Sequence, residues 1–216
     1  AGPDNRMWWT ESGTGRIGAT TLAGVVSEYP LPGGQAVGTT TTVTESPEDI
    51  TAGPDGNMWA TVDGSRKIAK ITTAGHVTEY ATPGVNGNSG VSGLAGIASG
   101  PGANVTGTAA GLWITGEGSF QTNANQADRP TSDGNGTLTF MTTGGVATQI
   151  PNPTSTPTAT ATTFAPAAIV AGPDGAMWMT DVGDNVIWRY LPGATVASGT
   201  WTGFPVPTPS AFSGNV

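Results

Sequence analysis

One phrase recurs along this chain, and it constrains the fold more than any other feature. Ala-Gly-Pro-Asp starts at residue 1 and returns as Ala-Gly-Pro-Asp-Gly at residues 52 and 171, each time followed within a few residues by Met-Trp. A degraded copy, Ser-Gly-Pro-Gly, starts at residue 99 and is followed by Leu112-Trp113. The tryptophans that mark the four copies are Trp8, Trp59, Trp113 and Trp178. A repeat of roughly 50 residues is typical of propellers and solenoids.

Each repeat contains four short segments with strand character, which are clearest in the second copy. There the predicted strands are 50–52, 57–61, 67–72 and 77–80, separated by Pro-Asp-Gly, Asp-Gly-Ser and Ala-Gly turns. No stretch of about 11 residues keeps apolar side chains at helical spacing without a Gly or Pro. We therefore predict an all-β fold, a β-propeller with four recognisable four-stranded repeats in a single domain, residues 1–216. The approximate repeat bounds are 1–46, 47–92, 93–165 and 166–216.

The first repeat lacks the short apolar strand that precedes the phrase in later copies, such as Asp49-Ile50-Thr51. Val216, in the terminal Ser-Gly-Asn-Val, would fill that place and close a four-blade ring. The alternative is that the chain is part of a larger propeller. Because the chain starts at Ala1 without a Met or a signal sequence, we expect a processed form or a fragment.

The charge balance excludes some partners. The net charge is −8 and the sequence pI is about 4.3, so this acidic protein is predicted not to bind nucleic acid. No apolar run approaches the roughly 18 residues of a membrane span, which argues against membrane insertion. The chain has no cysteine, hence neither a disulfide nor a thiolate nucleophile. The high content of Thr, Ala, Gly and Ser with little Lys is typical of exported proteins and predicts a secreted, extracellular location.

The second repeat resembles a known family. Its segments 50–59, Lys67–Ile71 and Gly75–Tyr80 closely resemble the repeat of the virginiamycin B lyase family, also called streptogramin B lyases. The resemblance runs through all four repeats and is weakest in the third. It implies a seven-bladed propeller that opens the ester-linked ring of type B streptogramin antibiotics by elimination, using Mg²⁺.

The resemblance also implies where catalytic residues would lie. Family histidines follow a Pro just before the first strand of a repeat, and a catalytic acid follows the Trp run. The corresponding residues here are, at the first place, Glu48, Ala95, Ala167 and Gly214, and at the second, Glu11, Val62, Gly116 and Asp181. No histidine occupies either place. The chain's one histidine, His76, is predicted to lie in an exposed turn.

Three acids remain as candidate metal ligands. Glu48, Glu11 and Asp181 are predicted to meet near the propeller axis and hold Mg²⁺ or Ca²⁺, since both ions prefer oxygen ligands. The alternative is that Glu11 and Asp181 cap local turns or stay solvated, in which case no cofactor is bound.

The tryptophans divide into two groups. The four that recur are predicted to pack between neighbouring blades, because burial of an indole stabilises a fold by several kcal/mol. The others, Trp9, Trp188 and Trp201, do not recur and are predicted to be exposed.

In a meander blade, the loop between the second and third strands and the linker between blades emerge on the same face. The long segments that this places together are Leu31–Pro47, Ala81–Gly93, Glu117–Asn135 and Pro151–Pro166. Long loops on a rigid scaffold favour binding. The leading hypothesis is a secreted, non-catalytic binding or structural assembly module that uses this long-loop face for a protein or glycan partner or for self-association. The alternative is a streptogramin-lyase-like (Mg²⁺-dependent carbon–oxygen lyase) or lactonase-like enzyme with an axial carboxylate site.

Overall fold

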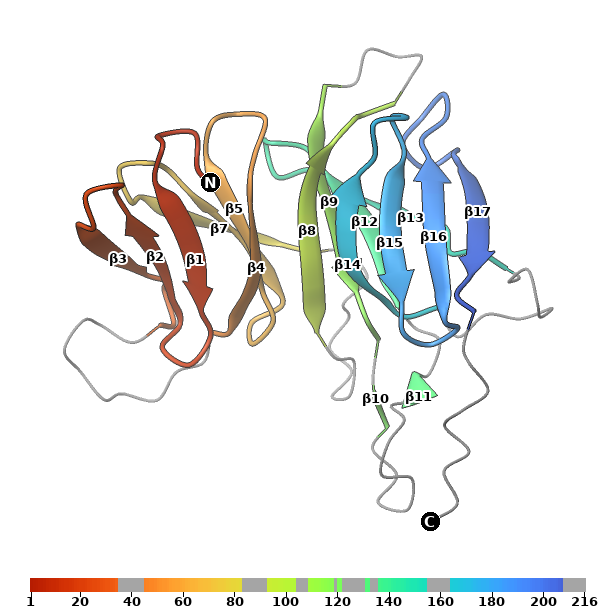
Figure 1. Cartoon of the computed structure of the whole chain (residues 1–216), viewed down its shortest axis with the longest axis horizontal. Helices are drawn as coiled ribbons and strands as arrows, with labels where there is room; N and C mark the ends of the chain where they lie inside the picture. The colour runs from red at the N-terminus through yellow and green to blue at the C-terminus, as the bar shows by residue number, and fades with distance from the viewer. Residues whose placement is uncertain are drawn as a thin grey trace.

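The described part of the chain is built from strands and turns. The computed structural model describes residues 1–34, 45–82, 93–103, 109–118, 120–121, 131–132, 136–154 and 164–207. These residues form four antiparallel sheets, each within one predicted repeat (Figure 1). The all-β prediction is confirmed for them. None of these residues belongs to a helix of the length and apolarity that crossing a membrane requires.

We number the sheets as blades 1 to 4 in chain order. Blade 1 contains β1 (Met7–Glu11), β2 (Arg16–Thr20) and β3 (Val26–Pro30), and blade 2 contains β4 (Pro47–Ala52), β5 (Met58–Val62), β6 (Lys67–Ile71) and β7 (Val77–Ala81). Blade 3 contains β8 (Leu94–Gly100), β9 (Gly111–Gly116), β12 (Thr137–Met141) and β13 (Ala147–Ile150). Blade 4 contains β14 (Pro166–Ala171), β15 (Met177–Asp181), β16 (Val186–Leu191) and β17 (Thr200–Pro205). Between β9 and β12, the short strands β10 (Phe120–Gln121) and β11 (Thr131–Ser132) form a separate pair.

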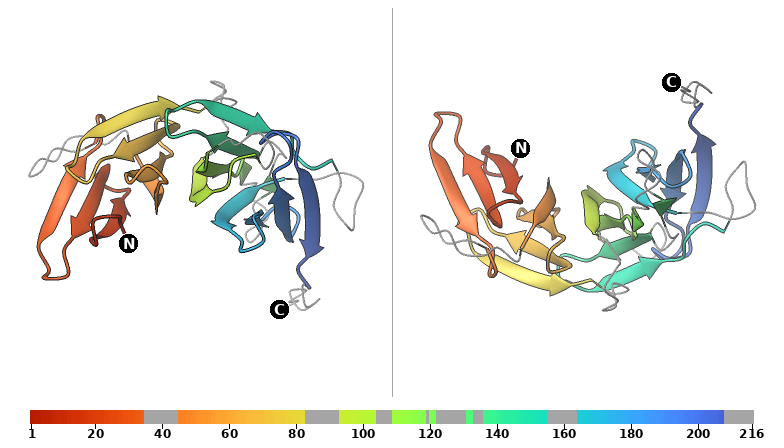
Figure 2. Two further views of the ribbon diagram at one scale, coloured as in Figure 1. Left: turned by 90° about the horizontal axis from the view of Figure 1, so that it is seen from above. Right: turned by 90° about the horizontal axis from the view of Figure 1, so that it is seen from below.

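The blades stand side by side around an arc. The first strands of blades 2 to 4 lie on its inner side, where β8 contacts both β4 and β14 (Figures 1 and 2). Blade 1 has three described strands, with β1 in the innermost place. The arc is open in Figure 2, with blades 1 and 4 at opposite ends. The described residues therefore form a propeller-like arc and show no closed four-blade ring, and Val216 lies outside them.

The inner strands carry a shared irregularity that the sequence pattern concealed. Strand β4 begins at Pro47, three residues before the predicted start, and its register with β5 shifts between Pro47 and Ile50. Equivalent shifts occur in β8 between Leu94 and Ile97 and in β14 between Pro166 and Ile169. A β-bulge breaks the alternation by which a strand is recognised and turns the local side chains in a new direction.

A threonine hydroxyl holds each bulge, and in blades 2 and 3 it also connects the bulge to the next blade. Thr61 Oγ1 accepts a hydrogen bond from the backbone N–H of Asp49 (3.0 Å) and donates to the carbonyl oxygen of Ala95 (2.8 Å). Thr115 Oγ1 likewise accepts from Gly96 N–H (2.9 Å) and donates to the Ala167 carbonyl. The Met-Trp-x-Thr phrase thus fixes both the bulge and the spacing between inner strands.

Three of the four recurring tryptophans pack between blades, as predicted, whereas Trp178 is partly exposed and stacks on Phe204 of its own blade. Trp59 is fully buried among blade 3 residues, including Leu94 and Ile97, and Trp113 is fully buried against blade 4. Trp8 is 7% exposed and packs in a cluster with blade 2 residues such as Met58. The apolar core therefore consists mainly of interfaces between neighbouring sheets.

The prediction that Trp188 is exposed was wrong. This side chain is 2% exposed and packs in the core between blades 3 and 4. It lies on the face of β16 that is directed at blade 3, together with Tyr190, because alternate residues of a strand share a face. Trp9 and Trp201 are partly buried, and Trp201 Nε1 donates to the Pro151 carbonyl at 2.9 Å.

Candidate functional site

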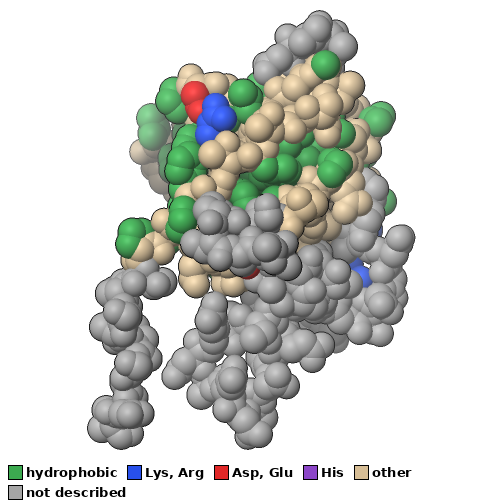
Figure 3. Space-filling model, turned by 90° about the vertical axis from the view of Figure 1, so that its right-hand side faces the viewer, with side chains coloured by type: hydrophobic (Ala, Val, Ile, Leu, Met, Phe, Trp, Pro, Cys, Tyr) green, Lys and Arg blue, Asp and Glu red, His purple; other side chains and the backbone are tan. Residues whose placement is uncertain are grey.

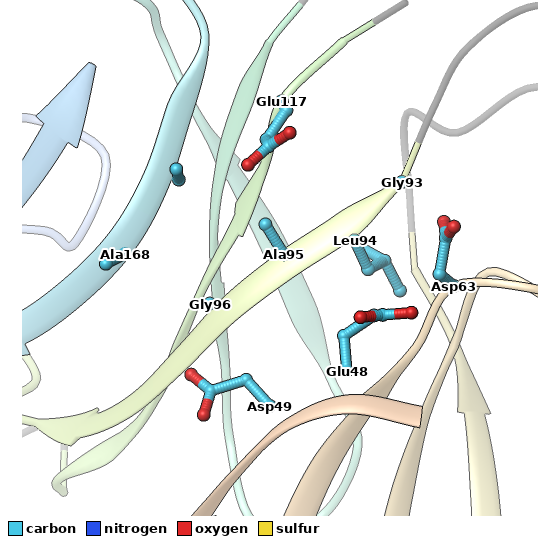
Figure 4. Close-up of a pocket in the computed structure, with 10 residues that line it drawn as sticks. Glu48, Asp49, Asp63, Gly93, Leu94, Ala95, Gly96, Glu117 and Ala168 are labelled. Atoms are coloured by element: carbon cyan, nitrogen blue, oxygen red, sulfur yellow. The ribbon is translucent and has the colours of Figure 1, made fainter. Parts of the chain in front are cut away.

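A cavity of about 510 Å³ lies against the inner side of the arc. It is lined by Glu48, Asp49, Asp63, Gly93, Leu94, Ala95, Gly96, Glu117, Ala167 and Ala168 (Figure 4). Glu48 follows the linker 31–47, Gly93 ends the linker 81–93, and Glu117 starts the insertion 117–135. The cavity, which we call the axial pocket, therefore lies on the predicted long-loop face.

The three bulges build much of the pocket wall. Glu48 and Asp49 come from the bulge of β4, Ala95 and Gly96 from that of β8, and Ala167 and Ala168 from that of β14. Three of these residues, Glu48, Ala95 and Ala167, occupy the positions where the family resemblance implies histidines. The structure brings these positions to one pocket, where one acid and two methyl groups replace the imidazoles.

Four carboxylates line this pocket, and besides Asp49, which backbone groups engage, three come from two blades. Glu48 lies in β4, Asp63 follows β5, and Glu117 follows β9 of blade 3 (Figure 4). Burial raises the pKa of Asp63, and the charge of Glu48 raises it further, while the Leu94 N–H and Arg66 offset only part of the rise. Burial also raises the pKa of Glu117, with smaller contributions from the charges of Asp63 and Glu48. The pocket is thus a region of negative potential in which the carboxylates repel one another.

Asp49 has a structural role at the edge of the pocket. Its Oδ1 accepts a hydrogen bond from the N–H of Ile50 (2.8 Å), and its Oδ2 accepts one from the N–H of Ile97 in blade 3 (2.9 Å). Both carboxylate oxygens are therefore engaged by backbone groups. Asp49 connects the bulges of β4 and β8, which holds the two sides of the pocket at a fixed separation.

The structure does not bring the three predicted metal ligands together. Only Glu48 lines the axial pocket. Glu11 accepts hydrogen bonds from Trp9 Nε1 (2.9 Å) and Thr14 Oγ1 (3.0 Å) on the outer face of blade 1. The position of Glu11 at the end of its strand corresponds to Val62 in blade 2, which is buried against the preceding blade and does not face the axis.

Asp181 is 4% exposed in the interface between blades 3 and 4. Its carboxylate accepts hydrogen bonds from Trp188 Nε1 (2.8 Å) and from the N–H groups of Gly183 (2.9 Å) and Ala165 (3.2 Å). These contacts agree with the alternative in which Asp181 caps a local turn. The acids that do reach the pocket, Asp63 and Glu117, lie one residue further along their repeats. An acid directly after the second strand was the sequence signal that could have identified them.

The described residues contain no cluster of three His, Cys, Asp or Glu side chains that could hold a metal ion. Carboxylate oxygens are suitable donors for Mg²⁺. Metal binding by Glu48, Glu11 and Asp181 stays a prediction. His76 is exposed between β6 and β7 and does not line the pocket.

Comparison with known proteins agrees with the repeat phrase and the arc of blades. The model described as the virginiamycin B lyase family matches residues 1–134, which is more than half of the chain. The chain belongs to the virginiamycin B lyase family. None of the curated proteins matches the sequence.

Solved structures show the same relationship. Virginiamycin B lyase from Staphylococcus aureus is 27% identical, with a TM-score of 0.66 over 96% of this chain and 54% of the lyase. A catalytically inactive variant of the S. aureus enzyme with quinupristin gives a TM-score of 0.65 at 27% identity, over 95% of this chain and 54% of that chain. This family member therefore spans about half the length of those enzymes.

The fold extends to other propellers. A gluconolactonase from Xanthomonas campestris is 14% identical, with a TM-score of 0.51 over 94% of this chain and 59% of that chain. At this level of identity the similarity shows the fold alone.

Proposed function

We propose that this virginiamycin B lyase family member is a non-catalytic binding module that takes a cationic group in its axial pocket. A peptide amine or an amino sugar on a partner would supply such a group. The observation that carries the proposal is the convergence of Glu48, Asp63 and Glu117 on one cavity. A bound cation would relieve the repulsion among these carboxylates, since opposite charges attract strongly where water is partly excluded.

The pocket's residues argue against the lyase reaction. Elimination next to a carbonyl needs a base and an electrophile that stabilises the enolate. Ala95 and Ala167 supply neither, and Glu48 is exposed and accepts a hydrogen bond from Ser46 Oγ at 2.9 Å. The alternative function, a lyase-like or lactonase-like enzyme, is favoured by family membership and by the S. aureus lyase structure with quinupristin.

Titration calorimetry with spermidine as a cationic probe tests the binding proposal. We expect spermidine to bind the chain, and expect neither glucose nor citrate to bind. The double variant Asp63→Asn with Glu117→Gln should weaken spermidine binding by about 10-fold or more, because it removes two of the four carboxylates that line the pocket. The matched control Asp174→Asn removes a charge from the far side of blade 4 and should leave binding unchanged. Equal spermidine affinity in all three proteins would contradict the proposal.

Incubation with quinupristin and Mg²⁺ distinguishes binding from catalysis. We expect mass spectrometry and chromatography to show no ring-opened product. Turnover that Asp63→Asn or Glu117→Gln abolishes would instead establish the enzymatic alternative. Secretion remains part of the proposal and is supported by composition alone. Recovery of the native protein from the culture medium of its source would test it.

A further inference from the structure

The two sides of the axial pocket differ in chemistry. The residues that blade 2 contributes are all acids, namely Glu48, Asp49 and Asp63. The residues that blade 4 contributes are both alanines, Ala167 and Ala168 (Figure 4). Blade 3, whose inner strand lies between those of blades 2 and 4, contributes one acid together with apolar side chains. The pocket therefore has an acidic side on blade 2 and an apolar side on blade 4.

The backbone acceptors at the three bulges are already engaged. The carbonyl oxygens of Ala95 and Ala167 accept hydrogen bonds from the threonine hydroxyls described above. The Glu48 carbonyl oxygen accepts one from Thr10 Oγ1 at 3.0 Å. Recognition of a ligand at these positions therefore falls to the side chains, which are a carboxylate on blade 2 and methyl groups on blades 3 and 4.

One glycine fixes the position of two of the acids. The carboxylate of Asp63 lies against the bare backbone of Gly93, where a Cβ would be 2.9 Å from Asp63 Oδ1. The carbonyl oxygen of Gly93 accepts a hydrogen bond from the N–H of Glu117 at 3.2 Å. The two acids and Glu48 thus present acceptors from three separate segments, which suits the three N–H donors of a primary ammonium group.

The other lining residues narrow the class of cation. Proteins bind quaternary ammonium groups on aromatic faces, and none of the described residues that line this pocket is aromatic. An amino sugar would place its hydroxyl groups against the methyl groups of Ala95 and Ala167, where they would lose hydrogen bonds to water without gaining partners. An unbranched hydrocarbon chain would gain from the same contact, because it buries apolar surface.

We propose that the axial pocket takes a primary ammonium group at the end of a short unbranched apolar chain, as in the side chain of a lysine on a partner peptide. The nitrogen would lie among Glu48, Asp63 and Glu117, and the chain would lie on Ala95 and Ala167. This inference rests on the cation-binding function proposed above and assigns its ligand. The cavity of about 510 Å³ has room for both parts of such a ligand.

Titration calorimetry with four small amines tests this assignment on the whole chain. Hexylamine should bind about 10-fold or more tightly than ethylamine, because it has four further methylene groups to bury. Hexyltrimethylammonium has the same charge and chain but no N–H donor, and should bind about 10-fold or more weakly than hexylamine. Glucosamine should also bind more weakly than hexylamine.

The variant Ala167→Glu locates the chain in the pocket. The same bulge position in blade 2 carries Glu48, so a glutamate there is compatible with the bulge. It replaces the methyl group on the apolar side by a carboxylate. The preference for hexylamine over ethylamine should fall to about threefold or less, whereas ethylamine should bind at least as tightly as to the wild type.

A second apolar surface supplies the control. Hydrophobic side chains gather at the blade 4 end of the molecule (Figure 3). Blade 4 alone lines a shallow cavity of about 200 Å³ there, to which Trp178, Ile187 and the 61% exposed Val170 contribute. Val170→Ser should leave hexylamine affinity unchanged, and circular dichroism should show that both variants keep the sheet structure.

The outcomes separate this inference from the function on which it rests. If spermidine binds but hexylamine binds no more tightly than ethylamine, the lysine-like ligand is wrong and the cation site stands. Tighter binding of glucosamine or hexyltrimethylammonium than of hexylamine would overturn the inference in the same way. A loss of hexylamine affinity in Val170→Ser would move the chain to the other cavity and overturn it as well. If neither spermidine nor hexylamine binds, both proposals fail.

Discussion

The indole N–H of Trp59 donates a hydrogen bond to Asp55 Oδ1 across 3.0 Å. The same bond joins Trp8 to Asp4 at 3.0 Å and Trp178 to Asp174 at 3.1 Å. The glycine two residues before each Asp lies against the indole, where a Cβ would be 2.4 to 2.5 Å from a ring atom. The phrase Gly-Pro-Asp-x-x-Met-Trp recurs because it fixes the position of the indole and gives its N–H a hydrogen-bond acceptor. In the third repeat, which lacks the Asp, Trp113 Nε1 donates instead to the Pro101 carbonyl at 2.9 Å.

Replacing Asp55 should destabilise the fold. Asp55→Ala removes the acceptor of the Trp59 bond and the 2.8 Å ion pair with Lys70, and it leaves a buried indole N–H without a partner. We expect a loss of about 2–3 kcal/mol in the free energy of unfolding, measured by denaturant titration. Asp174→Ala should cost less, because Trp178 and Asp174 are more exposed at the end of the arc. Equal losses of stability in Asp55→Ala and Asp174→Ala would show that burial of the indole does not determine the cost of removing its hydrogen-bond acceptor.

Asp55 should also contribute to acid unfolding. Burial raises its pKa, but hydrogen bonds from Lys70, Trp59 and Asn57 outweigh this and lower the pKa from its ordinary 3.8 to about 2. The folded state therefore holds this proton less tightly than the unfolded chain does. The stability that Asp55 contributes should be complete above pH 4 and should decrease as the pH falls towards 2. Asp55→Asn should remove that part of the pH dependence in a series of unfolding curves.

Asp63 should show the opposite dependence. Its pKa is raised by burial and by Glu48, so the folded state binds the proton more tightly than the unfolded chain does. Its charge should therefore lower stability at neutral pH, and this penalty should decrease as the pH falls through the raised pKa. Asp63→Asn is expected to raise the melting temperature at pH 7 and to have no effect at pH 3. Its amide oxygen can still accept from the Leu94 N–H. A melting temperature lowered at pH 7 would indicate a different role for Asp63.

The contact between the Tyr29 ring of blade 1 and Gly75 of blade 2 can be measured with two glycine substitutions, since a Cβ at Gly75 would lie 2.3 Å from the ring. Gly75→Ala and Gly24→Ala place a Cβ at nearly the same positive φ, 89° and 82°, but only the first meets a tyrosine ring. Gly24→Ala should cost about 1 kcal/mol for the backbone conformation. Gly75→Ala should cost about 2–4 kcal/mol, because Tyr29 must also move. Equal losses of stability in the two variants would argue against the contact between Tyr29 and Gly75.

The threonine bridge between blades is tested by Thr61→Val. The substitution keeps the shape but removes the donor to the Ala95 carbonyl and the acceptor for the Asp49 N–H, so we expect a loss of about 1–3 kcal/mol. Thr180→Val is the matched control, because Thr180 is exposed. Within the described part of the chain, its hydroxyl accepts a hydrogen bond from the Ala168 N–H at 3.2 Å and bonds to no other blade. Its loss should be under about 1 kcal/mol. Denaturant unfolding of both variants compares the stability lost at a threonine that bonds to the next blade with the stability lost at one that bonds only within its own blade.

The sequence by itself determined the blades and their packing. The repeat phrase located four sheets and the tryptophans between them, since a short-range motif fixes turn, strand and indole position within a few residues. It also indicated the pocket wall, because the residues at the family's histidine positions, Glu48, Ala95 and Ala167, all reach the axial pocket.

Only the tertiary structure decided which acids meet. Asp181 lies in the interface with blade 3, and Glu11 lies on the outer face of blade 1. Neither faces the axis, because the pleat directs alternate side chains to opposite faces and the predicted position was one residue away from the pocket. Asp63 and Glu117 line one pocket from different blades. Such relationships depend on the direction and order of the sheets in space, which a local repeat does not encode.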